Sequence, residues 1–202
     1  MVSKYITAQA AWEGMNEKLF SSGISSGNVC YSYDNVVIIQ KLWVNPEFDF
    51  GEKLGYTKSK WTHLVNNYVD LNYLDIIRAE VTRAEKTNRQ SYSFAYHFKN
   101  SHANGKDCLV GLIIARRLDS DVPVFTFFSR ATELTKRFLF DLLLIQRIGE
   151  YIYGDNRTIE LRLNIPMAYI QAESFTVYSN IKNLANLTNP KPTRFQQSVL
   201  AT

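Results

Sequence analysis

A thiol, a guanidinium group and a carboxylate follow one another in the stretch from Cys108 to Tyr151. Between the first two, the sequence VPVFTFFSR is rich in β-branched and aromatic residues, so it predicts a strand that ends at Arg130. The spacing changes at Thr132 to that of a helix. A cysteine thiolate is a nucleophile, and an arginine binds anions through paired hydrogen bonds. The strand and the helix must place these groups.

The carboxylate of Asp141 is the most unusual of the three, because it lies on the apolar face of the predicted helix from Thr132 to Tyr151. The apolar positions recur at about 100° per residue, and they are Leu134, Phe138, Leu142, Ile145, Ile148 and Ile152. A buried charge without a partner costs several kcal/mol. Asp141 is therefore either a core carboxylate satisfied by a backbone amide or an arginine, or a group that holds a ligand.

The order Cys108, Ser129-Arg130 and Asp141, with Asp141 eleven residues after the arginine, resembles the core of the thymidylate synthase family. In that family a cysteine precedes a strand, an arginine ending the next strand holds the nucleotide phosphate, and the following helix presents an asparagine to the pyrimidine. The branch that hydroxymethylates deoxycytidylate has aspartate there, as this chain does. Cytosine offers an N4 amino donor, which suits a carboxylate, whereas uracil suits an amide. The resemblance thus implies that dCMP is favoured over dUMP.

The resemblance spans roughly residues 55–178 and implies two further contacts. Arg89 stands nineteen residues before Cys108, where the family has an arginine that crosses a dimer interface to bind the partner subunit's phosphate. Tyr169 matches the tyrosine of a His-x-Tyr motif that holds the deoxyribose hydroxyl, although Met167 replaces the histidine.

The chain also departs from the family. Thr57-Lys58 matches a Thr-Lys loop that leads into a helix with a catalytic glutamate, yet no acid stands at 67–69 and Asp70 is the closest. Ala131 replaces a serine. Asp107 precedes the cysteine in place of a proline, and a neighbouring carboxylate opposes formation of a thiolate.

The implied activity is that of a pyrimidine deoxynucleotide C5 methyltransferase or hydroxymethylase. Cys108 would add to C6 of the base, 5,10-methylenetetrahydrofolate would supply one carbon, and Arg89 and Arg130 would clamp the phosphate. Asp141 would read the base. The resemblance also implies an α/β fold with a thymidylate-synthase-like mixed sheet and packed helices, a homodimer through that sheet, and a virus that modifies its DNA as the setting. The alternative is a protein of the same fold that binds a nucleotide, or assembles with something, without turnover.

Composition limits the function classes. The 202 residues, 46% of them hydrophobic, predict a single domain over 1–202. A net charge of +4 suits a small anionic ligand and is too mild to favour nucleic acid. Tyrosine and phenylalanine could stack on bases, but they are more economically explained as core. With two cysteines, Cys30 and Cys108, no zinc spacing and no long apolar run, we expect a cytoplasmic protein without metal or membrane span.

The remaining elements follow from periodicity and turn residues. Helices are predicted at 8–20, 56–69 and 71–87. One or two strands are predicted at 31–44, around Asp34-Asn35, and further strands in SYSFAYHF, CLVGLIIARR and TIELRLNIP, the last ended by Pro166. The segment AYIQAESFTVY is either a strand or a strand that passes into a helix.

Overall fold

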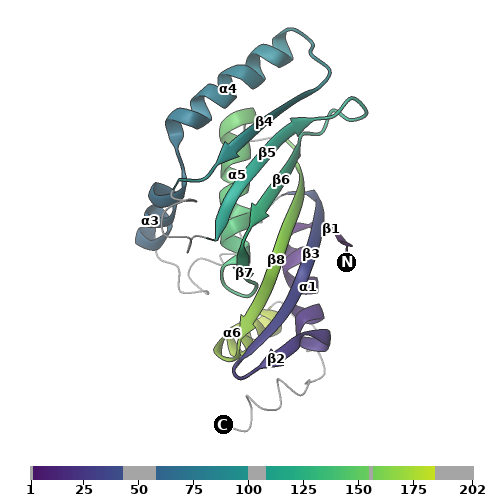
Figure 1. Ribbon diagram of the computed structural model, residues 1–202, viewed down its shortest axis with the longest axis vertical. Coiled ribbons are helices and arrows are strands. Elements are labelled where there is room, and N and C mark those ends of the chain that lie inside the picture. Colours follow the sequence, from purple (N-terminus) through teal and green to yellow (C-terminus); the bar gives the residue numbers. More distant parts are fainter. Residues whose placement is uncertain (1, 43–57, 100–107, 155–156, 185–202) are drawn as a thin grey trace.

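The computed structural model describes residues 2–42, 58–99, 108–154 and 157–184 (Figure 1). The elements are β1 (Val2–Thr7), α1 (Ala8–Ser22), β2 (Ile24–Ser26), β3 (Val29–Lys41), α3 (Lys58–Tyr68), α4 (Leu71–Lys86), β4 (Tyr92–His97), β5 (Leu109–Arg116), β6 (Val124–Ser129), β7 (Ala131–Glu133), α5 (Phe138–Tyr153), β8 (Glu160–Gln171) and α6 (Ala172–Leu184).

The strands form one mixed sheet in the order β1-β3-β8-β6-β5-β4, with β2 on β3 and β7 on β8. β1 runs parallel to β3, and β6 and β7 run parallel to β8. The other pairs are antiparallel. The prediction of an α/β fold with a mixed sheet and packed helices is confirmed at this level.

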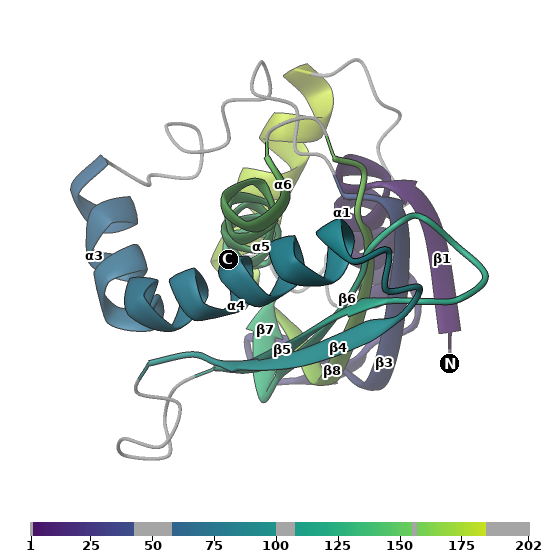
Figure 2. The ribbon, with the colours of Figure 1, turned by 90° about the horizontal axis from the view of Figure 1, so that it is seen from above.

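The helices gather on one side of the sheet (Figure 2). Residues of β6 and β8 that face them, such as Phe127 and Leu163, are fully buried against α5 and α1. All six positions of the predicted apolar face are buried, five of them in α5 and one, Leu134, just before it. Trp12 ties α1 to the chain ahead of α5, because its indole Nε1 donates to the Thr135 carbonyl at 3.0 Å. The central helix is thus fixed against both the sheet and α1.

Two sequence predictions around the central helix are wrong. The helix begins at Phe138 and not at Thr132, because residues 131–133 continue along β8 as the short strand β7. Pro166 does not end its strand, since β8 runs on to Gln171. The predicted helices at 8–20 and 71–87 and the strand at SYSFAYHF are confirmed.

Pro166 is accommodated where three neighbouring strands are all irregular. Its partners in register are Asp34, which has a positive φ of 53°, and Arg130, which lies between β6 and β7. Proline has no N–H to donate, so the sheet ladder is interrupted here. The buried side of β8 changes at this point: Ile165 is buried before it, whereas Ala168 and Ile170 are buried after it. Tyr169 therefore points away from the face that packs on α5.

Candidate functional site

Cys108 and Arg130 lie side by side at one end of the sheet. Cys108 immediately precedes β5 and Arg130 immediately follows β6, and these antiparallel strands pair through Leu109 and Ser129. The Arg130 backbone N–H donates to the Cys108 carbonyl at 2.8 Å. The Cys108 thiol is free and half-buried, while Arg130 is exposed. The thiol and the guanidinium group thus lie at the same end of the sheet, as the sequence predicts.

Asp141 is linked to this edge through two hydroxyl groups. Its carboxyl is hydrogen-bonded with the Thr132 side chain, and the Thr132 Oγ1 lies within hydrogen-bond distance, 3.3 Å, of Ser129 Oγ. Ser129 is the residue that pairs with the start of β5. Asp141 is 6% exposed, which confirms that it faces the interior. The carboxylate therefore has the hydrogen-bond partner that a core aspartate needs, and it also lies next to the strands that carry the thiol and the cation.

The protonation of Asp141 is finely balanced. Burial raises the pKa of its carboxyl to about 7, against the opposing effects of the Arg137 charge and the Thr132 hydrogen bond. Near neutral pH the group can therefore be either an acceptor or a donor toward a ligand.

Tyr169 lies close to Cys108 and to two charged residues, Glu133 and Arg137. In the sheet it pairs with Glu133 of β7 and with Tyr31 of β3. Burial raises the pKa of the Tyr169 hydroxyl, and Cys108 and Glu133 raise it further, while Arg137 lowers it. The structure therefore places Cys108 beside Arg130 and near Tyr169, whereas Asp141, buried on the other side of the sheet, reaches these strands only through Thr132 and Ser129.

Arg89 lies far from these residues. It follows α4, where its backbone N–H donates to the Ala84 carbonyl, and it precedes β4, whose first residue pairs with Arg116 at the far end of β5. The eight residues of β5 separate this end from Cys108, which is a distance of about 25 Å at the usual rise of a strand. Within one chain Arg89 does not reach the site, and its action across a dimer interface stays a prediction.

Two residues near the N-terminus of α5 were not singled out in the sequence. Arg137 acts electrostatically on both Asp141 and Tyr169. Glu133 is buried; its Oε2 accepts from the backbone N–H groups of Lys136 at 2.6 Å and Arg137 at 3.3 Å, and its Oε1 has no hydrogen-bond partner among the described residues. The spacing of four between Arg137 and Asp141 was the signal available for the arginine. The sequence contained no such signal for Glu133, because this residue was predicted to lie in a helix.

No acid stands at 67–69, at the end of α3, where the family carries its catalytic glutamate. Asn67 pairs with His63 through the side-chain nitrogen atoms at 2.9 Å. Asp70 caps α4, because its Oδ1 accepts from the Tyr73 N–H at 3.3 Å. Thr57, Lys106 and Asp107 lie outside the described residues.

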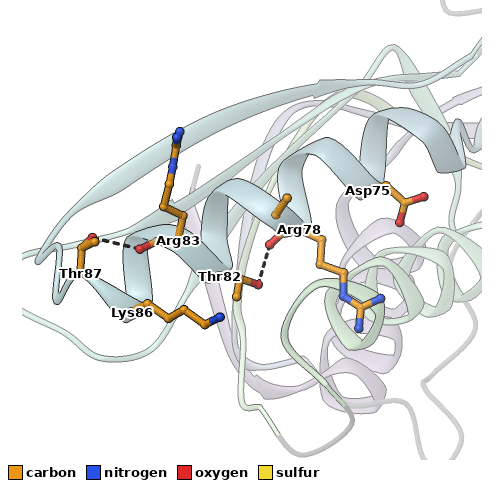
Figure 3. A pocket seen from close by; sticks show the side chains of 7 residues that line it. Asp75, Arg78, Thr82, Arg83, Lys86 and Thr87 are labelled. Carbon is orange, nitrogen blue, oxygen red and sulfur yellow. Dashed lines mark hydrogen bonds between the residues drawn. The ribbon is translucent and has the colours of Figure 1, made fainter.

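A shallow hollow of about 620 Å³ on the outer face of α4 contains none of the predicted site residues (Figure 3). Asp75 at its edge accepts from the Tyr151 hydroxyl, and the Arg78 guanidinium lies 5.2 Å from the centre of the Tyr151 ring. Arg83 is paired with Glu80. The contacts of Asp75 and Arg78 with Tyr151 bind α4 to α5.

Comparisons with known proteins add no family. No family model matches the chain, and no curated protein matches it. No helix in the part of the chain that the structure describes is long and apolar enough to cross a membrane. The described residues also contain no group of three or more His, Cys, Asp and Glu side chains placed to hold a metal ion.

Proposed function

We propose that this protein binds a pyrimidine deoxynucleotide, dCMP in preference to dUMP, and transfers a one-carbon unit to C5 of the base. The observation that carries the proposal is the meeting of Cys108 and Arg130 at one end of the sheet, with Asp141 linked to that end through Thr132 and Ser129, in the order that resembles the thymidylate synthase family. The fold that this implies is a thymidylate-synthase-like form of the observed α/β architecture.

The chemistry assigned to these side chains is covalent catalysis. The Cys108 thiolate would form a bond to C6, which makes C5 nucleophilic; C5 would take the carbon unit and lose its proton. The bond from that carbon to its carrier would break, water or hydride would add to the carbon, and the sulfur would leave C6. Arg130 holds the phosphate and Asp141 accepts from the cytosine N4 amino group. Tyr169 is placed to contact the sugar.

The carbon donor proposed is 5,10-methylenetetrahydrofolate, which supplies the one-carbon unit when bound. The buried Glu133 Oε1, which lacks a partner among the described residues, fits such a group, because a pterin ring presents N–H donors along one edge. Glu133 pairs in register with Tyr169, so this acceptor lies beside the proposed nucleotide site. Arg137 is positioned to balance the negative charge of both acids.

The test is release of tritium from dCMP and dUMP labelled at C5, with the folate present. Loss of the C5 proton requires covalent activation of the ring, so release reports the chemical step. We expect release from dCMP that exceeds release from dUMP and that disappears in Cys108→Ser. Release that survives in Cys108→Ser would remove the thiol from the mechanism.

A second candidate function, nucleotide binding without turnover, is favoured by one specific observation. The turn at 67–70 offers Asn67, engaged with His63, and Asp70, engaged as a helix cap, in place of a free carboxylate. Under this alternative the protein binds dCMP by calorimetry but releases no tritium. The two measurements together separate an enzyme from a binding protein.

We also propose that the protein is a two-fold dimer through the sheet face that the described helices leave open. Apolar side chains on this side are partly exposed, with Phe128 at 37% and Tyr33 at 54%. Covering such a surface is the usual reason for self-association. Light scattering at micromolar concentration should give twice the chain mass of 23.3 kDa, and Phe128→Asp should shift it toward the monomer. A parent protein that is monomeric would contradict the dimer and leave Arg89 without a role in the site.

A further inference from the structure

A separate pocket of about 570 Å³ lies at the end of the sheet opposite Cys108. It is lined by Glu85, Arg116, Asp121, Val122, Arg157 and Thr158. These residues come from the end of α4, the end of β5, the β5–β6 connection and the chain before β8, which meet at the end of the molecule away from β7 (Figure 1). Sites for small molecules usually measure about 300–1,000 Å³, so the space suits one small ligand.

The pocket contains both a donor and an acceptor that are buried and not hydrogen-bonded. Arg116 pairs with Asp121 through Nη2, but its buried Nε has no hydrogen-bond partner among the described residues, and its side chain is only 22% exposed. The buried Glu85 Oε1 likewise has no hydrogen bond there, although it forms an ion pair with Arg157 Nη2 at 3.6 Å. A buried donor or acceptor that is left without a hydrogen bond destabilises the folded protein. A ligand that satisfied both would remove this destabilisation.

Three charged groups of the pocket, those of Glu85, Arg116 and Arg157, all act on the buried Tyr92. The Tyr92 hydroxyl donates to the Tyr153 hydroxyl at 3.0 Å. Burial raises the pKa of Tyr92, and the charged groups that act on it are Glu85, which raises it, and Arg116 and Arg157, which lower it. Arg157 is held in place, because its Nη2 donates to the Asp121 carbonyl at 3.1 Å. Two guanidinium groups, of Arg116 and Arg157, and two carboxylates, of Glu85 and the more exposed Asp121, thus line the same small space.

We propose that this pocket binds a small oxyanion that carries a hydrogen-bond donor next to the anionic group. Arg116 and Arg157 donate to the oxyanion, which suits planar guanidinium groups better than point charges. Glu85 accepts from the neighbouring donor of the ligand. Two sources have this chemistry: a phosphate monoester with an adjacent hydroxyl group, and an α-amino acid. The pocket is independent of the proposed nucleotide site, since β5 separates the two.

The experiment is calorimetric titration of the full chain with matched pairs of small ligands. Glycerol 3-phosphate is compared with methyl phosphate, and glycine with acetate, so that each pair differs in the donor. We expect one donor-bearing ligand to bind at millimolar concentration or tighter and its partner to bind about tenfold more weakly, which is the effect of one hydrogen bond to a charged group. The pair that responds identifies the source.

Variants tie the binding to the pocket. Arg116→Gln and Glu85→Gln should each weaken the preferred ligand about tenfold. Arg157→Gln repeats the test at a more exposed position, in case the substitution of Arg116 prevents folding. Arg117→Gln is the matched control, because Arg117 neighbours Arg116 but pairs with Asp119 outside the pocket. The proposal is overturned if none of the four ligands binds at about 10 mM, or if affinity is the same in the control and in the pocket variants.

Discussion

Replacing Asp141 by asparagine should change the stability of the folded protein relative to the parent in a way that becomes more favourable to the variant as the pH rises. In the native state the Asp141 carboxyl keeps its proton up to about pH 7, because burial raises its pKa from 3.8 to about 7. In the unfolded chain it loses the proton near 3.8. The native state therefore binds more protons between these values, so the free energy of unfolding of the parent falls as the pH rises through this range. Asparagine stays neutral and has no such dependence.

The size of the effect follows from the pKa difference. At about 1.4 kcal/mol for each tenfold change in proton affinity, the rise from 3.8 to about 7 corresponds to about 4 kcal/mol in total. About 3 kcal/mol of this falls between pH 5 and pH 8, because part of the range lies below pH 5. The difference in stability between Asp141→Asn and the parent should therefore become more favourable to the variant by about 3 kcal/mol between these two pH values.

The assay is urea unfolding of parent and variant at pH 5 and pH 8, followed by fluorescence and circular dichroism. Asp119→Asn is the control, since Asp119 is exposed and its pKa is lowered by the hydrogen bond from Arg117. A lowered pKa gives stability that is already complete above the unfolded value of 3.8, so the effect of this substitution should be the same at both pH values. An Asp141→Asn difference that does not change with pH would refute the reasoning, because it would mean that the native carboxyl is ionised throughout.

Three further predictions concern the site. Asp141→Asn should reverse the base preference from dCMP toward dUMP by about 2 kcal/mol in calorimetric affinity, because an amide donates to uracil O4 where a carboxylate repels it; absence of binding by either nucleotide to the parent at millimolar concentration would leave Asp141 as a core carboxylate. Cys108→Ser should abolish turnover and keep nucleotide affinity within a few-fold, because the thiolate acts in the covalent step; a large loss of affinity would instead assign Cys108 to binding. Arg137→Gln should raise the pKa of Asp141 above that of the parent, because the guanidinium charge lowers it; an NMR titration of the carboxyl that is unchanged in this variant would remove Arg137 from the site.

The sequence predicted elements well where one face of an element decides its structure. The apolar positions of α5 and the alternating aromatic residues of β4 have a single period, and both elements lie where the period places them. The prediction was wrong for the first turns of the helix. Thr132 and Leu134 fit a helical spacing, but residues 131–133 instead form sheet hydrogen bonds with β8. Such pairing with a strand about forty residues later has no local signal. β1 was missed for the same reason, since only its pairing with β3 makes it a strand.

The sequence predicted which residues belong to the candidate site, but only part of their arrangement in space. The resemblance grouped Cys108, Arg130 and Asp141, and in the structure the first two meet at one end of the sheet while Asp141 is linked to that end through Thr132 and Ser129. The sequence could not place Arg89, whose distance from the site depends on how β4 pairs with β5. It could not reveal Glu133 either, because the orphaned Oε1 arises from tertiary burial.

The irregular line through Asp34, Pro166 and Arg130 also restricts how the chain length can change. Side chains alternate along a strand, so removing one residue moves every later side chain to the other surface. Deleting Pro166 alone would carry Tyr169 onto the surface that packs on α5 and expose Ala168, which is fully buried. Loss of a residue from one of these three strands would also shift its register against the two neighbouring strands. The side on which Tyr169 meets Cys108 is thus set by a proline three residues away, and the three strands can gain or lose residues here only together.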